Sequence, residues 1–241
     1  MYVKTEAIVL SHKKIRDNVT LLSLYTREMG RASFLFYGSG GKHGGRAYSM
    51  LQPLSLVEIE TDLRNAKELQ VVKEMKCLHP LHDAMFDPYK SSILFFLAEV
   101  LSNALRTNES DELLFRFLTE SVLTLNEMDS SVCNFHIAFL VRLSAFLGFG
   151  PNVCDLSGAR YFDLVQAEYT DQHPSHTQFV GDSDARFLQS LCRMNYRNLN
   201  RFRFSKRERN ELLDHIIDYH RIHLQGFGDL KTLSVLHEVF D

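Results

Sequence analysis

Residues 5–38, TEAIVLSHKKIRDNVTLLSLYTREMGRASFLFYG, determine the fold expected for the first part of the chain. They contain three short segments that are apolar and rich in β-forming residues, separated by the polar turns KKIRDN and REMG. Two similar segments follow, LSLVEIE at residues 54–60 and ELQVVKEMK at residues 68–76. Five short strands with turns between them predict a small barrel or sandwich.

From about Asp87 onward, the apolar residues recur at helical spacing. The segment 88–106 begins with Pro88, which suits the first turn of a helix, and the segment 109–128 has Ser110 as its candidate N-cap. The segment 132–150 is apolar on nearly every side, which predicts a buried central helix that ends near two glycines.

Three more helical segments complete the second half of the sequence, at residues 184–194, 206–224 and 231–240. The sequence therefore predicts an α+β protein, with an all-β small barrel at residues 1–80 and an α-helical domain at residues 81–241. Residues 151–181 lose the helical period, and we expect them to form an irregular excursion within the second domain.

Composition favours a folded protein of the cell interior. The 241 residues are 45% hydrophobic and 24% charged, which is typical of globular proteins. No apolar run approaches the roughly 20 residues that cross a bilayer, and the N-terminus lacks the features of a signal peptide. The four cysteines form no closely spaced pair, so we expect reduced thiols, no metal and a cytoplasmic location.

The net charge of −3 conceals a strongly uneven distribution. Residues 1–80 contain 12 Lys+Arg against 8 Asp+Glu, and residues 81–192 contain 6 against 15. Residues 193–209 contain 7 against 1, and residues 210–241 contain 2 against 6. Such asymmetry indicates a surface for a polyanion, although solvated charged faces give similar runs.

The loop GSGGKHGGR at residues 38–46 joins the third and fourth expected strands and contains five glycines. It does not fit a phosphate-binding P-loop, because His43 follows Lys42 where Ser or Thr is required and Phe36 occupies the position of the first glycine. Two interpretations remain: a solvated hairpin loop, or a basic finger in which Lys42 and Arg46 contact a nucleic-acid backbone.

Other cations near the turns of this half could join that loop on one face of the barrel: Lys13, Lys14, Arg16 and Arg31. Five aromatic residues are candidates for base stacking: Tyr25, Phe34, Phe36, Tyr37 and Tyr48. Strand alternation places some of these rings in the core, so we expect only one or two to be available.

A second basic stretch, RMNYRNLNRFRFSKRER, covers residues 193–209 and interleaves cations with aromatic rings. Its candidate contact residues are Arg193, Arg197, Arg201, Arg203, Lys206 and Arg207. This pattern suits nucleic acid and equally suits an acidic protein tail, because carboxylates pair with guanidinium groups as phosphates do. Pairing with the acidic stretch of the same chain is the alternative.

Two histidine clusters raise the possibility of a metal-dependent hydrolase, one at His79 and His82 and the other at His220 and His223. A hydrolytic metal site needs three or more convergent ligands, and an i, i+3 pair supplies two. Surface histidines explain both clusters better. No nucleophile motif is present either, so the sequence predicts no catalytic residue and no cofactor.

Four segments resemble the RecO family of bacterial recombination mediators: AIVLSHKKIRDNVTLLSLYTREMGRASFLFYGSGG, MLQPLSLVEIE, FLGFGPNVC and HLQGFGDLKTLSVL. They occur in the family order and span nearly the whole chain. The resemblance implies an N-terminal OB-fold barrel on an α-helical C-terminal domain, without an enzymatic active site.

The resemblance also implies a role in DNA repair and recombination in the bacterial cytoplasm, at the nucleoid. Family members bind single- and double-stranded DNA, anneal complementary strands and act with RecR to load recombinase onto coated strands. They recognise the acidic C-terminal tail of the single-stranded-DNA-binding protein. For that tail, the basic residues beside apolar helical stripes are candidates: Arg106, Arg116 and Arg142. Many relatives carry two C-x-x-C pairs that bind zinc, but here Cys154 alone occupies that region, so we predict no zinc.

One alternative from a different class stays open. The chain could be a protein-interaction adaptor whose barrel binds a peptide and not DNA. It predicts partner binding without measurable affinity for nucleic acid, which separates the two hypotheses.

Overall fold

The computed structural model describes residues 2–38, 50–62, 69–106, 109–152, 159–181 and 190–240, together with Ala185 and Leu188. The chain forms two compact units, residues 1–127 and 128–241. The change from strands to helices occurs near residue 80, as expected, but the first unit continues through two long helices beyond that point.

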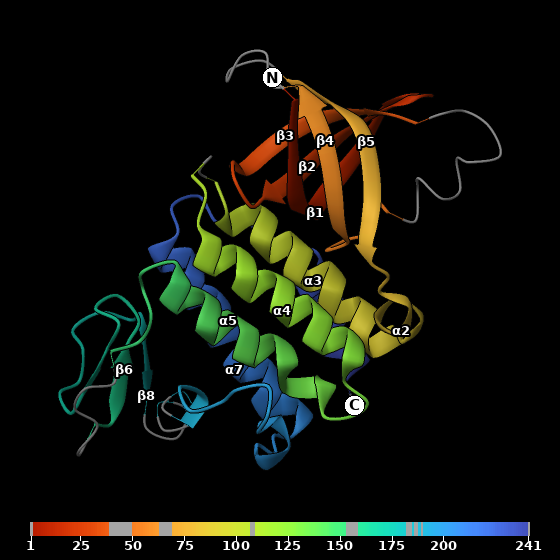
Figure 1. The fold of residues 1–241 in the computed structure, drawn as a ribbon. Coiled ribbons are helices and arrows are strands. Elements are labelled where there is room, and N and C mark those ends of the chain that lie inside the picture. Colours follow the sequence, from red (N-terminus) through yellow and green to blue (C-terminus); the bar gives the residue numbers. More distant parts are fainter. Residues whose placement is uncertain are drawn as a thin grey trace. The chain divides into compact units, whose positions relative to one another are not determined.

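The first unit begins with five strands: β1 (Tyr2–Arg16), β2 (Val19–Thr26), β3 (Gly30–Tyr37), β4 (Leu56–Asp62) and β5 (Gln70–His79). They close into a barrel in the order β1-β2-β3-β5-β4, with β4 pairing again with β1 (Figure 1). Neighbouring strands are antiparallel except β3 and β5, which are parallel. A closed five-stranded barrel followed by helices agrees with the predicted OB fold and helical domain.

Alternate residues of the strands point inward and form the barrel core, as a period of two requires. Leu22, Leu24, Phe34 and Ile59 are completely buried there. Hydrophobic burial of this kind stabilises the barrel and fixes its register, because a shift by one residue would expose the whole set.

Three helices complete the first unit: α2 (His82–Phe86), α3 (Pro88–Ala104) and α4 (Glu112–Glu127). As expected, α3 begins at Pro88, and the side chain of Asp87 accepts hydrogen bonds from the first backbone amides. The prediction that Ser110 is the N-cap of α4 is wrong. The Asp111 carboxylate accepts the Leu114 amide at 2.9 Å and therefore caps that helix.

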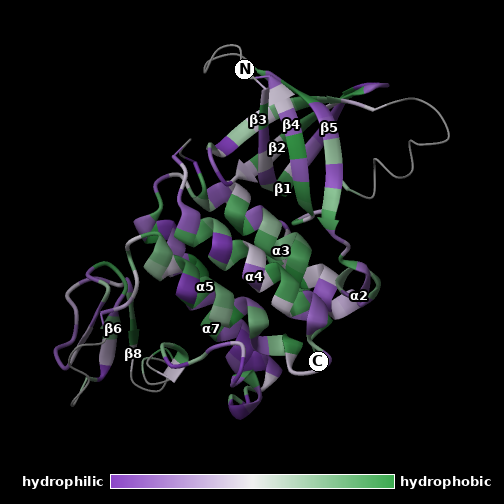
Figure 2. Ribbon diagram, in the orientation of Figure 1, coloured by the Kyte–Doolittle hydropathy of each residue, from purple (hydrophilic) through white to green (hydrophobic). Residues whose placement is uncertain are grey.

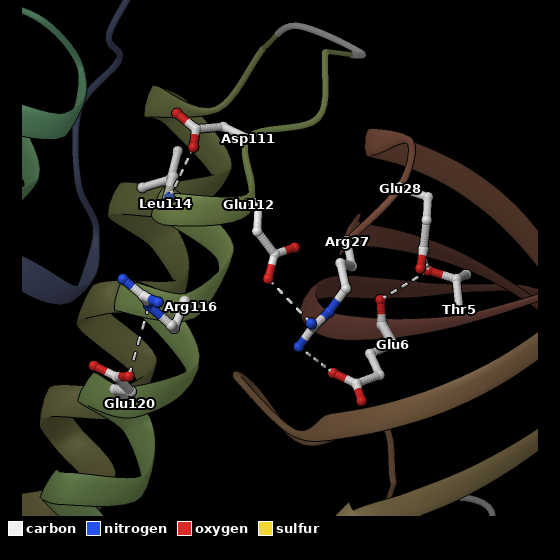
Figure 3. Close-up of polar contacts among 9 residues, drawn as sticks. All are labelled: Thr5, Glu6, Arg27, Glu28, Asp111, Glu112, Leu114, Arg116 and Glu120. Atoms are coloured by element: carbon white, nitrogen blue, oxygen red, sulfur yellow. Dashed lines mark hydrogen bonds and ion pairs between the residues drawn. The ribbon is translucent and has the colours of Figure 1, made fainter.

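Two arginines of the barrel bind helices of the same unit, and Figure 3 shows one of them, Arg27. Arg27 forms ion pairs with Glu6 at 2.7 Å and with Glu112 at 3.1 Å, and its guanidinium lies over the Phe115 ring. Arg31 donates to the carbonyl oxygens of Ser102 and Leu105, both at 2.7 Å. The end of α3 is thereby attached to β3, and the start of α4 is attached to the turn between β2 and β3.

The second unit contains the remaining elements: η1 (Val132–Asn134), α5 (Phe135–Phe146), β6 (Tyr161–Asp163), β7 (Glu168–Thr170), β8 (Phe179–Gly181), η2 (Leu199–Arg201), α7 (Lys206–His223) and α8 (Thr232–Val239). Hydrophobic residues dominate α5, the expected central helix, which packs against α7 (Figure 2). It ends just before Gly148, whose φ of 85° favours glycine.

The excursion expected at residues 151–181 is more regular than the sequence indicates. Its strands form a small antiparallel sheet in the order β7-β6-β8. Inside this sheet region, the Asp163 carboxylate accepts the amides of Val165 and Gln166 and contacts His176 at 3.0 Å. Burial acts to raise the pKa of Asp163, but the hydrogen bonds from the two amides and from His176 together outweigh it, so the pKa lies below its ordinary value.

Candidate nucleic-acid interface

The first strand is longer than the strand that closes the barrel against it. β4 pairs with Tyr2–Ile8, and among the described residues Ser11–Arg16 pair with β2 alone. This end of β1 forms a hairpin with the start of β2 that turns at Asp17 and Asn18, and we call the side of β1 that pairs with no described strand the free edge of the hairpin. The expected polar turn KKIRDN is thus wrong in extent, because four of its six residues belong to a strand.

Strand register decides which side chains share a face of this hairpin, since directly paired residues point the same way. Lys13 pairs with Leu21 and Arg16 pairs with Val19. In the next pair of strands, Leu21 and Val19 face Leu35 and Tyr37. All six lie on the outer face of the sheet, because their neighbours Leu22 and Phe34 fill the core. We call this set the β2–β3 face: Lys13, Arg16, Val19, Leu21, Leu35 and Tyr37.

The β2–β3 face combines three kinds of group. Lys13 and Arg16 are exposed at its edge, Val19, Leu21 and Leu35 are half-buried, and the Tyr37 side chain is 54% exposed. Cations at the edge of an apolar surface with an exposed ring can hold phosphates while a base stacks on the ring. Strands 2 and 3 and the β1–β2 loop are also the usual ligand surface of OB folds.

The other predicted barrel cations have different positions. Lys14 points to the opposite side of the hairpin, where it pairs with Asp17 at 3.3 Å. Arg31 is bound to carbonyl groups of α3, and burial, with a smaller effect of Arg106, lowers its pKa. Lys42 and Arg46 lie outside the described residues, in the segment joined to β3 after Gly38.

The expectation that few aromatic rings are available is confirmed for the barrel residues that the structure describes. Tyr25 and Phe34 are buried, and Phe36 packs against the core. Tyr37 is exposed, and Tyr48 lies outside the described residues. The apolar members of the face, Val19, Leu21 and Leu35, were not selected as candidates from the sequence. The two-residue turn at Asp17 and Asn18 sets the register of β1 against β2, and the alternation of β2 and β3 then places these three residues on the outer face.

The second basic stretch divides into two groups. Arg193, Arg197, Arg201 and Arg203 are exposed. Lys206 approaches the Glu238 carbonyl oxygen at 3.5 Å, and Arg207 forms an ion pair with Glu211 at 2.7 Å. Buried Arg209 contacts the carbonyl oxygens of Phe204 and Phe240. The α7 N-terminus is completed by a capping box of Ser205 and Glu208, so an acidic neighbour balances the cations of its first turn.

The three candidates for binding an acidic tail have separate surroundings. Arg106 donates to the Asn103 carbonyl oxygen, and Arg116 lies 3.8 Å from Glu120 in the same unit. Arg142 belongs to the second unit, where its guanidinium lies 5.6 Å from the centre of the Tyr196 ring.

The interpretation as surface histidines holds for His79 and His82, which are exposed, and is wrong for the cluster at His220 and His223, which is engaged within the fold. His220 is buried and hydrogen-bonds with the Ile216 carbonyl oxygen at 2.8 Å, while His223 does so with that of Leu164. Across the described segments, no group of three or more His, Cys, Asp or Glu is placed to hold a metal ion. Cys154 lies outside these segments. Among the described helices, none has the length and apolar content needed to span a membrane.

Comparisons with known proteins cover the whole chain. The family model described as "Recombination protein O N terminal" matches residues 1–81, and "Recombination protein O C terminal" matches residues 85–233. The chain is 39% identical over 241 residues to the DNA repair protein RecO of Azobacteroides pseudotrichonymphae, with full coverage of both chains. The proteins of the same name from Phocaeicola vulgatus and Bacteroides fragilis are 40% and 39% identical, again over their full lengths. The chain therefore belongs to the RecO family, which acts in DNA repair and recombination.

Proposed function

We propose that this chain is a noncatalytic recombination mediator that binds single-stranded DNA on the β2–β3 face of its barrel. The observation that carries the proposal is the combination, on that one face, of two exposed cations, an apolar row and the exposed Tyr37 ring. Membership of the RecO family, which acts in DNA repair and recombination, supports single-stranded DNA as the ligand of this face.

Each component of the face has a separate role in the proposed complex. Lys13 and Arg16 bind phosphates along the free edge of the hairpin, and this charge interaction does not depend on base sequence. Tyr37 provides a stacking surface beside the half-buried leucines. A strand held by its backbone, with its other bases accessible, can pair with a complementary strand, which fits a role in annealing.

Membership of the family supports a proposal about partners. We propose that the chain binds double-stranded DNA as well, acts with RecR and recognises the C-terminal tail of the single-stranded-DNA-binding protein, thereby promoting the loading of recombinase. Arg106, Arg116 and Arg142 remain candidates for the tail. Location in the bacterial cytoplasm, in association with the nucleoid, belongs to the same proposal.

The first test is fluorescence anisotropy of labelled single-stranded DNA in a salt series. The double substitution Lys13→Gln, Arg16→Gln removes two phosphate contacts, so the slope of log affinity against log salt should become shallower by about 1.4. The matched control is Lys4→Gln, Lys76→Gln, which removes two barrel cations already paired with Glu58 and Glu74. The control should bind like the wild-type protein.

The substitution Tyr37→Ser tests stacking separately from charge. Loss of one stacked base costs about 1–3 kcal/mol, so affinity should fall roughly 5-fold or more while the salt slope stays unchanged. Binding of Tyr37→Ser with wild-type affinity would contradict a stacking role for this ring.

The glycine-rich loop is a further arm of the same experiment. If Lys42 and Arg46 contact phosphates, Lys42→Ala, Arg46→Ala should reduce the slope by about 1 to 1.5. Unchanged binding would make the loop a connector only. Absence of DNA binding by the wild-type protein, together with binding of an acidic peptide, would reject the proposal and support the adaptor hypothesis.

A further inference from the structure

Residues 193–205 of the second unit, which we call the arginine loop, contain four arginines and no acidic residue. They lead from the helical segment that includes Leu191 through consecutive turns and η2 to the N-cap of α7. The side chains of the four arginines are exposed: Arg193, Arg197, Arg201 and Arg203.

The backbone of the arginine loop is held by a chain of hydrogen bonds. The Asn198 side chain accepts the Asn195 amide at 2.8 Å and donates to the Arg193 carbonyl oxygen at 3.0 Å. Further along, Asn134 donates to the Phe202 carbonyl oxygen at 2.8 Å. These bonds fix the loop before any ligand arrives, which reduces the entropic cost of binding.

Apolar side chains attach the loop to the rest of the unit. Met194 and Leu199 are buried, and the Tyr196 ring stacks on Phe135 with a centroid distance of 4.5 Å. Phe202 is half-buried. The rings of this stretch therefore serve packing, and the exposed part of the loop consists largely of guanidinium groups.

The four exposed arginines differ from the cations that follow them. Lys206, Arg207 and Arg209 have partners within the unit. In the part of the chain that the structure describes, the hydrogen bonds of Arg193, Arg197 and Arg201 involve their backbone atoms, and none of the four loop arginines forms an ion pair with an acidic residue. Pairing with the acidic stretch, the alternative considered from the sequence, is therefore not observed for these four among the described residues.

We propose that the arginine loop is a second phosphate-binding surface for a nucleic-acid backbone, distinct from the β2–β3 face and carried by the other compact unit. An acidic peptide with a hydrophobic end needs an apolar groove beside the charges, but the rings here are engaged in packing. Phosphates need only fixed, spaced cations, which this loop provides. The proposal rests on the proposed function, and it adds that one molecule contacts DNA through both units.

The test uses the full-length protein and labelled single-stranded DNA in a salt series. The substitution Arg201→Gln, Arg203→Gln should reduce the slope of log affinity against log salt by about 1.4. Arg201→Lys, Arg203→Lys keeps both charges and should retain the wild-type slope. The matched control is Arg221→Gln, Lys231→Gln in the same unit, because Arg221 is already paired with Asp218 and Asp229 and both residues lie outside the basic stretch at residues 193–209. It changes the net charge equally and should leave the slope unchanged.

Three outcomes would overturn the inference. If Arg201→Gln, Arg203→Gln binds like wild type while Lys13→Gln, Arg16→Gln is weakened, DNA binding belongs to the barrel alone. If neither pair matters because the wild-type protein does not bind DNA, the proposed function fails as well. If the loop substitutions weaken binding of a polyglutamate peptide and leave DNA binding intact, the loop recognises an acidic protein segment.

Discussion

Two arginines of the barrel, Arg27 and Arg31, direct their guanidinium groups at helices of their own unit. Arg27 joins Glu6 and Glu112 (Figure 3), and its guanidinium lies over the Phe115 ring. Arg31 donates to two carbonyl oxygens at the end of α3. Such half-buried, charge-assisted bonds stabilise the fold and leave little of the charge for a ligand. Lys13, by contrast, is exposed at the free edge of the hairpin.

At the residue scale, we therefore predict opposite effects for Arg31 and Lys13. Arg31→Met should lower the free energy of unfolding by about 2 kcal/mol, because two carbonyl oxygens lose a charged donor, and it should leave the salt slope of DNA binding unchanged. Lys13→Met should leave the free energy of unfolding unchanged and should make the salt slope of DNA binding shallower. Urea unfolding and anisotropy on both variants measure the two quantities, and a large loss of DNA affinity in Arg31→Met would contradict this division.

A helix begins where a side chain accepts hydrogen bonds from its first backbone amides, and in α4 two adjacent residues could have done so. Ser110 and Asp111 are both good capping residues and adjacent, so composition alone does not separate them. The carboxylate of Asp111 binds the Leu114 amide, and the negative charge also favours the helix N-terminus. The helix therefore begins one residue later than expected.

At the element scale, Asp111→Ala should lower the free energy of unfolding by about 1 kcal/mol, whereas Ser110→Ala should change it little. Thermal or urea unfolding of the two single variants makes the comparison. Equal effects of the two substitutions would show that the cap is shared.

Elements with a long periodic pattern of apolar residues were predicted correctly from the sequence, and elements with a short pattern were not. Strong alternation identified the five strands, and Pro88 marked the start of α3. The three-residue strands of the second unit are too short to show a period of two. Residues 13–16 were assigned to a turn because they are polar, but a strand with a free edge can be polar on both faces. Nor does any local pattern show that Arg31 binds carbonyl groups 71 and 74 residues further along.

At the scale of the whole molecule, and among the described residues, the two histidines whose pKa is strongly lowered, His136 and His220, both lie in the second unit. Burial lowers the pKa of His136 to about 3, with smaller effects of Arg209 and His237. Burial also lowers the pKa of His220 to about 4, partly opposed by its bond to Ile216. Both pKa values lie below the unfolded value of about 6.5, so the folded state binds fewer protons. Stability from the neutral rings is complete above pH 6.5 and is lost as the pH falls from 6.5 toward 4.

At this scale, we predict that the second unit is the acid-sensitive one. Each of the two histidines should reduce the free energy of unfolding by about 2 kcal/mol between pH 7.5 and pH 5. His220→Leu should remove its share of this pH dependence, and the exposed His12→Gln should not. Urea unfolding at both pH values provides the measurement, and an unchanged pH dependence in His220→Leu would contradict the assignment.

The attachment of α3 and α4 to the barrel also matters while the protein is being synthesised. The last barrel strand is complete at residue 79, but α4 ends only at residue 127. This helix provides Glu112, which binds Arg27, and Phe115, whose ring stacks on Tyr25. At translation rates of about 5–20 residues per second, the nascent barrel waits roughly 2–10 s for that cover. Within this interval the Arg31 guanidinium lacks its carbonyl acceptors until residue 105 is made, and Tyr25 lacks its aromatic neighbour until residue 115 is made. The growing chain thus passes through a stage at which all five barrel strands have been made but the barrel surface that α3 and α4 later cover is accessible to chaperones.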